Sequence, residues 1–267
     1  MKNAKVCVLR IEGTNCEEET AEALRMVGAV PELVHLNMMR KEAPSDVRRS
    51  LEDYDMLMIP GGASAGDYLR AGALFAARIK EVIGDEVKRF VTDERPVIGI
   101  GNGFQVLVEM GLLPAFDEAM SESPTAALCL NDSAKSECRH TVLRNDNKGN
   151  CRFLSEIPEG SLVSFPVAHM EGRLTSCDAD FVEKLEDNDQ IVFRYVKPDG
   201  TDAEYPWNPS GSISDIAAIC NPIGNVMGMM PHPERVMTRY GHAGWSRNPD
   251  RKEGDGTSMF RSIMNGL

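Results

Sequence analysis

Residues 96–107 read PVIGIGNGFQVL and decide the fold, because they join a strand, a sharp turn and the start of a helix. The apolar run over 97–100 is typical of a strand buried on both faces of a parallel sheet. Gly99, Gly101 and Gly103 follow at the spacing of a nucleophile elbow, which lifts its central side chain onto a helix N-terminus. Because the central residue is itself glycine, the alternative is that all three glycines only allow close packing of strand and helix.

The same alternation of strand and helix runs through the preceding residues. Glu17, Glu18 and Glu19 stand where the first turn of a helix favours negative charge. Gly84 interrupts the helical spacing of apolar residues over 75–90, which indicates one long helix or two joined ones. Strands are expected over 5–11, 31–37 and 55–62, and helices over 17–28, 46–54 and 75–90. This order predicts an α/β fold with a doubly wound, mostly parallel sheet.

The regular alternation of strands and helices ends after about residue 115. Strand-like runs at 141–145, 161–169 and 191–196 have little helix between them, which predicts antiparallel additions to the sheet or a β-rich flap. Residues 213–230 supply two more strands and 257–267 a closing helix, while 145–150, 184–189 and 198–203 are expected to be turns. No linker separates two units, so we expect a single domain over residues 1–267.

Composition excludes several classes of protein. Against 29 Lys+Arg stand 41 Asp+Glu, and the net charge of -12 would repel a phosphate backbone, so we expect no nucleic-acid partner. The 7 cysteines include no C-x-x-C pair, which disfavours a disulfide framework or a zinc ribbon and fits a reducing, cytoplasmic location. No apolar run is long enough for a membrane span or a signal peptide, so no membrane association is expected.

Three segments are expected to converge, because ligands of open α/β sheets bind beyond the carboxyl ends of the strands. They are PGGASAGDYLRAGA at 60–73, GIGNGFQ at 99–105 and MMPHPER at 229–235. In the first, Gly61 and Gly62 expose backbone N–H groups that suit an oxyanion or a phosphate, although a tight turn alone is the alternative. It is not a Walker loop, since no Gly-Lys-Ser/Thr follows.

The third segment contains a candidate general base. Prolines on either side of His232 stiffen the backbone, and Glu234 lies two residues on, so in an extended stretch both side chains point the same way. A histidine oriented by a carboxylate activates a nucleophile. A surface His-Glu pair without a catalytic role is the alternative.

Five stretches together resemble a known family. GTNCEEET at 13–20, the glycine-rich exit at 61–73, the elbow at 96–107, PVAHMEGR at 166–173 and GMMPHPER at 228–235 are similar to the small glutaminase subunit of phosphoribosylformylglycinamidine synthase. The resemblance spans nearly the whole chain. It implies a flavodoxin-like, class I glutamine amidotransferase domain that hydrolyses L-glutamine and sends ammonia to a large synthetase subunit in purine biosynthesis.

The resemblance also implies partners and cofactors. A small bridging subunit is expected beside the large one. No cofactor or metal is expected in this chain, because ATP and Mg are used by the synthetase subunit.

Carried over by position, the catalytic triad of the family falls on residue 101 as nucleophile, His232 as base and Glu234 as the group that orients the imidazole. The family has cysteine at the first position, whereas this sequence has Gly101. The backbone N–H groups of Gly62 and Asn102 correspond to the oxyanion donors. The resemblance thus implies an elbow without its thiol.

The remaining family positions form a glutamine pocket. Those implied to bind glutamine are Gly61, Gln105, His169 and Glu171, for which a helix surface or a strand end is the structural alternative. Cys16 also matches the family and is interpreted as structural. Ala63 and Ala65 stand where the family often has aromatic residues, which predicts a roomier pocket.

Gly101 leaves two functions open. A glutaminase subunit that has lost its nucleophile is expected to be inactive, because no thiolate can attack the amide. The alternative is a non-catalytic scaffold or glutamine-sensing subunit of a synthetase that uses free ammonia. Retention of His232, Glu234 and Gly103 favours a recent or deliberate loss of the nucleophile. No other cysteine has the setting of an activated thiol.

Overall fold

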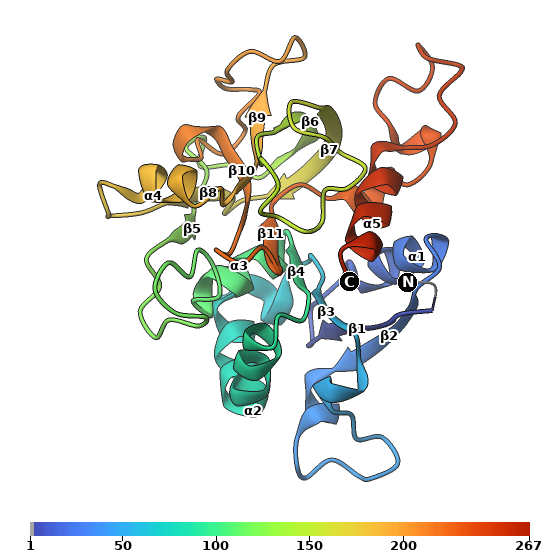
Figure 1. The fold of residues 1–267 in the computed structure, drawn as a ribbon, viewed down its shortest axis with the longest axis vertical. Helices are drawn as coiled ribbons and strands as arrows, with labels where there is room; N and C mark the ends of the chain where they lie inside the picture. Colours follow the sequence, from blue (N-terminus) through green and yellow to red (C-terminus); the bar gives the residue numbers. More distant parts are fainter. Residues whose placement is uncertain (1–2) are drawn as a thin grey trace.

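Nine strands form one mixed sheet in the computed structural model, which describes residues 3–267 (Figure 1). The order across the sheet is β2-β1-β3-β4-β11-β10-β9-β6-β7, and β5 and β8 form a separate pair. The strands are β1 (Lys5–Arg10), β2 (Val30–His35), β3 (Met56–Ile59), β4 (Val97–Ile100), β5 (Ala127–Cys129), β6 (Glu137–Asn145), β7 (Leu162–His169), β8 (Arg173–Thr175), β9 (Ile191–Val196), β10 (Ile216–Cys220) and β11 (Val226–Met229).

One half of the sheet is parallel. β2, β1, β3, β4 and β11 pair in the order of a flavodoxin-like sheet, which confirms the predicted fold. Successive residues of β1 enter opposite cores, Val6 and Val8 on one face and Cys7 and Leu9 on the other. Such burial on both faces explains the continuous apolar runs of these strands.

The other half is antiparallel, as predicted for the second part of the chain. β10 runs against β11, β9 against β10, β6 against β9 and β7 against β6. Four reversals restore the direction of β11, so β7 ends at the same edge as the parallel strands. This brings His169, the last residue of β7, to the edge where ligands of α/β sheets bind.

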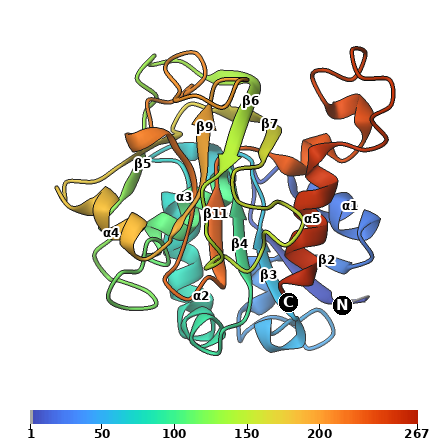
Figure 2. The same ribbon diagram turned by 45° about the horizontal axis from the view of Figure 1, so that its top comes forward.

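Helices cover both faces of the sheet. Figure 2 shows α1 and α5 on one face and α2, α3 and α4 on the other. Their bounds are α1 (Glu17–Met26), α2 (Ala73–Thr92), α3 (Asn102–Glu109), α4 (Phe181–Asp187) and α5 (Asp255–Asn265). α2 is a single helix with a kink at Ile83, next to Gly84. No helix within residues 3–267 has the length and apolar character to cross a membrane.

Two sequence predictions were wrong. The helix expected over 46–54 is only a 3₁₀ turn over Leu51–Asp53, because Ser50 caps that turn and Tyr54 is already extended. The turn expected over 184–189 belongs largely to α4, whose Phe181 and Leu185 lie one helical turn apart and bury the same face. Both errors concern short elements whose state depends on a single cap or packing contact.

Candidate active site

Gly101 forms a sharp turn between β4 and α3. Its backbone has φ +54° and ψ −112°, in the left-handed range that favours glycine. Its N–H donates to the carbonyl oxygen of Met229 at 2.8 Å, and its own carbonyl accepts from the N–H of Phe104 at 3.0 Å. The turn is therefore tied to the end of β11 and to the first turn of α3, as in a nucleophile elbow.

The three elbow glycines have different reasons to be glycine. A Cβ at Gly103 would overlap the carbonyl oxygen of Ile59, and one at Gly99 would lie 2.5 Å from the carbonyl oxygen of Gly103. A Cβ at Gly101 would instead meet only the ring of His232, at 2.9 Å, before any backbone atom. Close packing against backbone thus explains the two outer glycines, while a side chain at the central position would point at an imidazole that has to shift to admit it.

His232 and Glu234 form a buried pair. The Nδ1 atom of His232 lies 2.6 Å from Oε1 of Glu234, and the residues are 3% and 5% exposed. The expected extended backbone is wrong, because Pro233–Val236 form a 3₁₀ turn that folds the carboxylate back onto the ring. The backbone N–H of His232 donates to the carbonyl oxygen of Pro166 at 2.8 Å and fixes the turn against β7. The alternative of an exposed surface pair is excluded.

The strand exit after β3 lies against this pair. A Cβ at Gly61 would come within 2.6 Å of the His232 ring, so glycine is needed for the ring to approach. Gly62 has φ +130° and forms an isolated antiparallel bridge with Thr14. The glycines at 61 and 62 are therefore more than a tight turn, because they make room for the imidazole and for the Asn15 backbone.

A chain of side-chain hydrogen bonds holds the start of α3. The amide of Asn102 donates to Gln105 at 2.9 Å and to Asp67 at 3.2 Å, and its oxygen accepts from Ser64 at 2.5 Å. As the first helical residue, Asn102 has a backbone N–H with no acceptor inside the helix. Burial raises the pKa of Asp67, and the nearby charge of Glu171 adds to that rise.

The proposed glutamine-binding residues lie around the same space. Gln105 is 5% exposed and not on the helix surface, and its Nε2 donates to the carbonyl oxygen of Glu171 at 2.6 Å. The Glu171 carboxylate accepts from the N–H of Ala71 at 3.0 Å, which joins the β7–β8 turn to the strand-exit loop. His169 is 6% exposed, and its Nδ1 lies 3.0 Å from Oδ1 of Asn131.

Gln105, His169 and Glu171 line one cavity of about 430 Å³, together with the predicted oxyanion donors Gly62 and Asn102 and the predicted base His232. Gly61, Gly101 and Glu234 are not among its lining residues. Its lining is Asn15, Cys16, Gly62, Ala63, Asp67, Ala71, Asn102, Gln105, Ser136, Ala168, His169, Met170, Glu171, Met230, His232 and Arg235. Ala63 is in this wall, as expected, whereas Ala65 is not. Sequence reasoning did not assign Asp67 or Arg235 to the site, although both lie inside the quoted motifs.

Cys16 belongs to the site and not only to the structure around it. Its Sγ lies within 4.8 Å of ligand atoms of His232 and Glu234, a donor set that includes metal-binding types. However, the guanidinium of Arg235 donates to that Sγ at 3.2 Å, so a cation already faces the thiol. Burial and the charge of Glu234 raise the pKa of Cys16 to about 12, which disfavours a thiolate nucleophile at this position.

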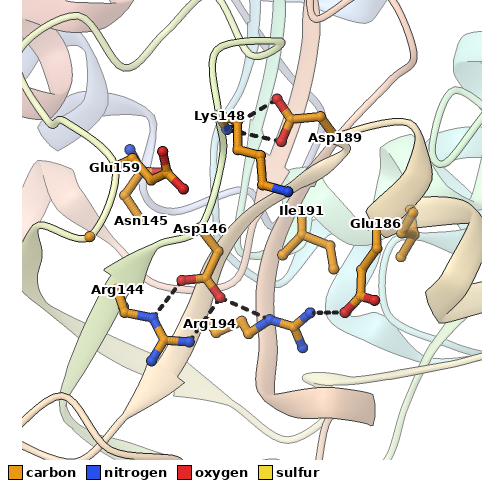
Figure 3. Close-up of a pocket in the computed structure, with 11 residues that line it drawn as sticks. Arg144, Asn145, Asp146, Lys148, Glu159, Glu186, Asp189, Ile191 and Arg194 are labelled. Atoms are coloured by element: carbon orange, nitrogen blue, oxygen red, sulfur yellow. Dashed lines mark hydrogen bonds and ion pairs between the residues drawn. The ribbon is translucent and has the colours of Figure 1, made fainter.

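A second cavity, of about 420 Å³, lies at the opposite end of β6 and is strongly charged (Figure 3). Asp146 joins Nε of Arg144 at 2.5 Å and Nε of Arg194 at 2.9 Å, and Arg194 continues to Glu186 at 2.7 Å. These ion pairs fasten β9 to the end of β6 and to α4. They offer no nucleophile next to a base.

Comparisons with known proteins agree with this geometry. The family model of the CobB/CobQ-like glutamine amidotransferase domain matches residues 3–265. The phosphoribosylformylglycinamidine synthase subunit PurQ of Archaeoglobus fulgidus is 46% identical, covering 98% of this chain and 97% of its own length. PurQ of Picrophilus torridus is 44% identical, with 99% of both chains covered. The chain belongs to the PurQ family.

A solved structure supports the same assignment. A chain in the structure of PurLQS from Thermotoga maritima has a TM-score of 0.73 and 32% identity, and the match covers 99% of each chain. PurQ is the glutaminase subunit of phosphoribosylformylglycinamidine synthase in purine biosynthesis. The PurQ fold therefore surrounds an elbow that carries glycine in this chain.

Proposed function

We propose that this chain is the glutaminase-type subunit of a phosphoribosylformylglycinamidine synthase, that it binds glutamine, and that, with Gly101 at the elbow, it neither hydrolyses glutamine nor supplies ammonia. One observation carries the proposal. A side chain at position 101 would point at the ring of His232, whose Nδ1 lies 2.6 Å from Oε1 of Glu234, so a base with its orienting carboxylate faces a position without a nucleophile.

The geometry supports a role for each group around a glutamine amide. With a thiol at position 101, Nε2 of His232 would take its proton, while Glu234 holds the imidazole and stabilises its charged form. The N–H groups of Asn102 and Gly62 would face the oxyanion of the tetrahedral intermediate. Gly61, Gln105, His169 and Glu171 would hold the amino-acid end of glutamine. Without the sulfur, the covalent step has no attacking atom.

The partners of the relatives guide the rest of the proposal. The name of the Thermotoga maritima structure, PurLQS, indicates that PurL and PurS accompany PurQ there. We therefore expect a large synthetase subunit and a small bridging subunit as partners of this chain. We expect ATP and Mg²⁺ to act on the synthetase subunit and this chain to work in the cytoplasm. A scaffold or glutamine-sensing role in a synthetase that uses free ammonia is the second candidate, favoured by the missing thiol.

We predict that the complex of this chain with its synthetase partner makes product from ammonia but not from glutamine. Product formation and glutamate release are measured with purified subunits and all substrates. Ammonia-dependent synthesis should survive, because that reaction needs no glutamine hydrolysis. Steady glutamate release at an ordinary enzyme rate would overturn the assignment of residue 101 as the nucleophile position.

Glutamine binding separates the proposed subunit from a pure scaffold. Calorimetry of the assembled complex should detect glutamine, because the backbone N–H groups and Gln105 do not depend on residue 101. A complex that shows no binding of glutamine would support the scaffold instead of the glutamine-binding subunit.

A further inference from the structure

His169 has a fixed hydrogen-bonding state that follows from the contacts of Asn131. Nδ2 of Asn131 lies 2.8 Å from the carbonyl oxygen of Lys135 and 2.9 Å from that of His169. Carbonyl oxygens only accept, so this atom of the amide must be the nitrogen. The oxygen of the same amide then faces the N–H of Gly172 at 3.1 Å and Nδ1 of His169 at 3.0 Å.

An amide oxygen accepts and never donates, so Nδ1 of His169 carries the hydrogen. A neutral imidazole with its hydrogen on Nδ1 has a lone pair on Nε2. That Nε2 is buried and has no hydrogen-bond partner among the described residues, although buried polar atoms normally have one. Such an unsatisfied acceptor in a cavity wall indicates a missing donor.

The surroundings keep the ring neutral and in place. Burial and the neighbouring His232 lower the pKa of His169 to about 4, and only Glu137, its cross-strand partner in β6, and a backbone hydrogen bond of His169 itself oppose them. A Cβ at Gly172 would overlap the imidazole, so the turn after β7 closes directly on the ring. The ring is therefore a neutral acceptor throughout the physiological range.

We infer that Asn131 is a positioning residue that presents Nε2 of His169 to the cavity as a permanent acceptor for an N–H donor of the bound glutamine. This inference rests on the proposed function and adds to it the chemical class of the group that His169 contacts. The donor is the α-ammonium or the side-chain amide, which share this chemistry. A neutral acceptor can hold either group without giving it a proton, because no hydrogen lies on Nε2.

The hydrogen-bonding state is tested first, in the full chain without ligand. Nitrogen NMR of the histidine rings, with His169→Gln used to assign the signal, should show Nδ1 protonated and Nε2 unprotonated from pH 8 to pH 5. Asn131→Asp should leave Nδ1 protonated but let Nε2 gain a proton as the pH falls within this range, because a carboxylate against Nδ1 favours the charged ring. A hydrogen on Nε2 of the unsubstituted protein would overturn the inference.

The matched control is Asn225→Asp. Asn225 is also buried, donates to the carbonyl oxygens of Val91 and Arg95, and lies at the other end of β11 from His232. Asn225→Asp should lower the free energy of unfolding by an amount similar to Asn131→Asp and leave the NMR signal of His169 unchanged. A change of the His169 signal in this control would show that the effect of Asn131→Asp is a general loosening of the fold, which would contradict the positioning role.

Ligand binding is tested by calorimetry of the complex with its partner. At a pH where the NMR signal shows the ring of the Asn131→Asp variant to be charged and that of the unsubstituted protein neutral, Asn131→Asp should weaken glutamine binding roughly 3- to 30-fold, the effect of one hydrogen bond, and Asn225→Asp should not. Two glutamine analogues identify the donor. If the α-ammonium is the donor, the variant should bind L-glutamate, which lacks the amide, more weakly than the unsubstituted complex does. If the amide is the donor, the variant should bind glutaramate, which lacks the α-amino group, more weakly. If glutamine binds both Asn131→Asp and the unsubstituted complex equally, the inference is wrong, whereas failure of both to bind would contradict the proposed function itself.

Discussion

At the scale of single residues, Gly101 is the one position of the proposed catalytic triad that differs from the family, while His232 and Glu234 are retained. Elbow residues with a side chain are held at strained backbone angles, at a cost of roughly 1–3 kcal/mol, and glycine avoids that cost at φ +54°. On the proposed function, the glycine removes the nucleophile and at the same time relaxes the turn. Stability and glutaminase activity should change in opposite directions when the side chain is restored.

We predict that Gly101→Cys makes the complex a glutaminase and lowers the free energy of unfolding by roughly 1–3 kcal/mol. The His232 ring has to yield, because the new Cβ would lie 2.9 Å from its Cε1 and Nε2. Loss of the nucleophile in a triad hydrolase costs roughly a million-fold, so the gain should be large. Glutamate release and denaturant unfolding measure the two effects.

Gly101→Ala is the matched control for this variant. It adds the same Cβ and backbone strain without the sulfur, so it should lose stability and stay inactive. A folded, partner-bound Gly101→Cys protein that neither hydrolyses glutamine nor reacts with a glutamine-like electrophile, and that is unaffected by His232→Ala, would refute the triad assignment.

His169 makes stability depend on pH. Its pKa falls from 6.5 in the unfolded chain to about 4 in the fold, so between these values the unfolded chain binds the proton that the native protein excludes. Stability is then full above about pH 6.5 and falls as the pH drops toward 4, by about 3 kcal/mol for this group. Urea unfolding at pH 7 and pH 5 should show a smaller difference in His169→Gln, and an equal difference would contradict the shifted pKa.

At the scale of elements, the glycines of two helices should respond oppositely to alanine. In α2, a methyl group added at Gly84 would have no atom closer than 3.9 Å, and the residue has no unusual φ, so Gly84→Ala should stabilise by about 0.5–1 kcal/mol. In α3, Gly103→Ala should destabilise strongly, because its Cβ would overlap the carbonyl oxygen of Ile59. Thermal unfolding of both variants measures the contrast, and a destabilised Gly84→Ala would show that the kink at Ile83 needs the glycine.

The strands and the elbow could be predicted from sequence because their signals are local. Buried strands show as apolar runs, and the glycine frame of 99–103 lies within a few residues. Other features could not be predicted in this way. The role of Asn131 depends on contacts with a turn 38 residues away in the chain, and Cys16 meets Arg235 although 219 positions separate them. These contacts form because the order of strands in the sheet brings distant loops together, and no local sequence pattern predicts that order.

At the scale of the whole molecule, the two cores share one sheet. Val6 and Val8 of β1 enter one core and Cys7 and Leu9 the other, so neither core can be lost without disturbing the same strand. We therefore predict a single domain that unfolds in one transition. Calorimetric and van't Hoff enthalpies of unfolding should agree, and two separate transitions would contradict a single cooperative unit.

The intact surroundings of Gly101 also have a genetic consequence. The glycine codons GGU and GGC become the cysteine codons UGU and UGC when the first base alone changes. Because the buried pair of His232 and Glu234 is in place beside the elbow, Gly101→Cys alone should supply the missing group, with a shift of the His232 ring. On the proposed function, a GGU or GGC codon at position 101 would place the silent and the hydrolytic forms a single base change apart.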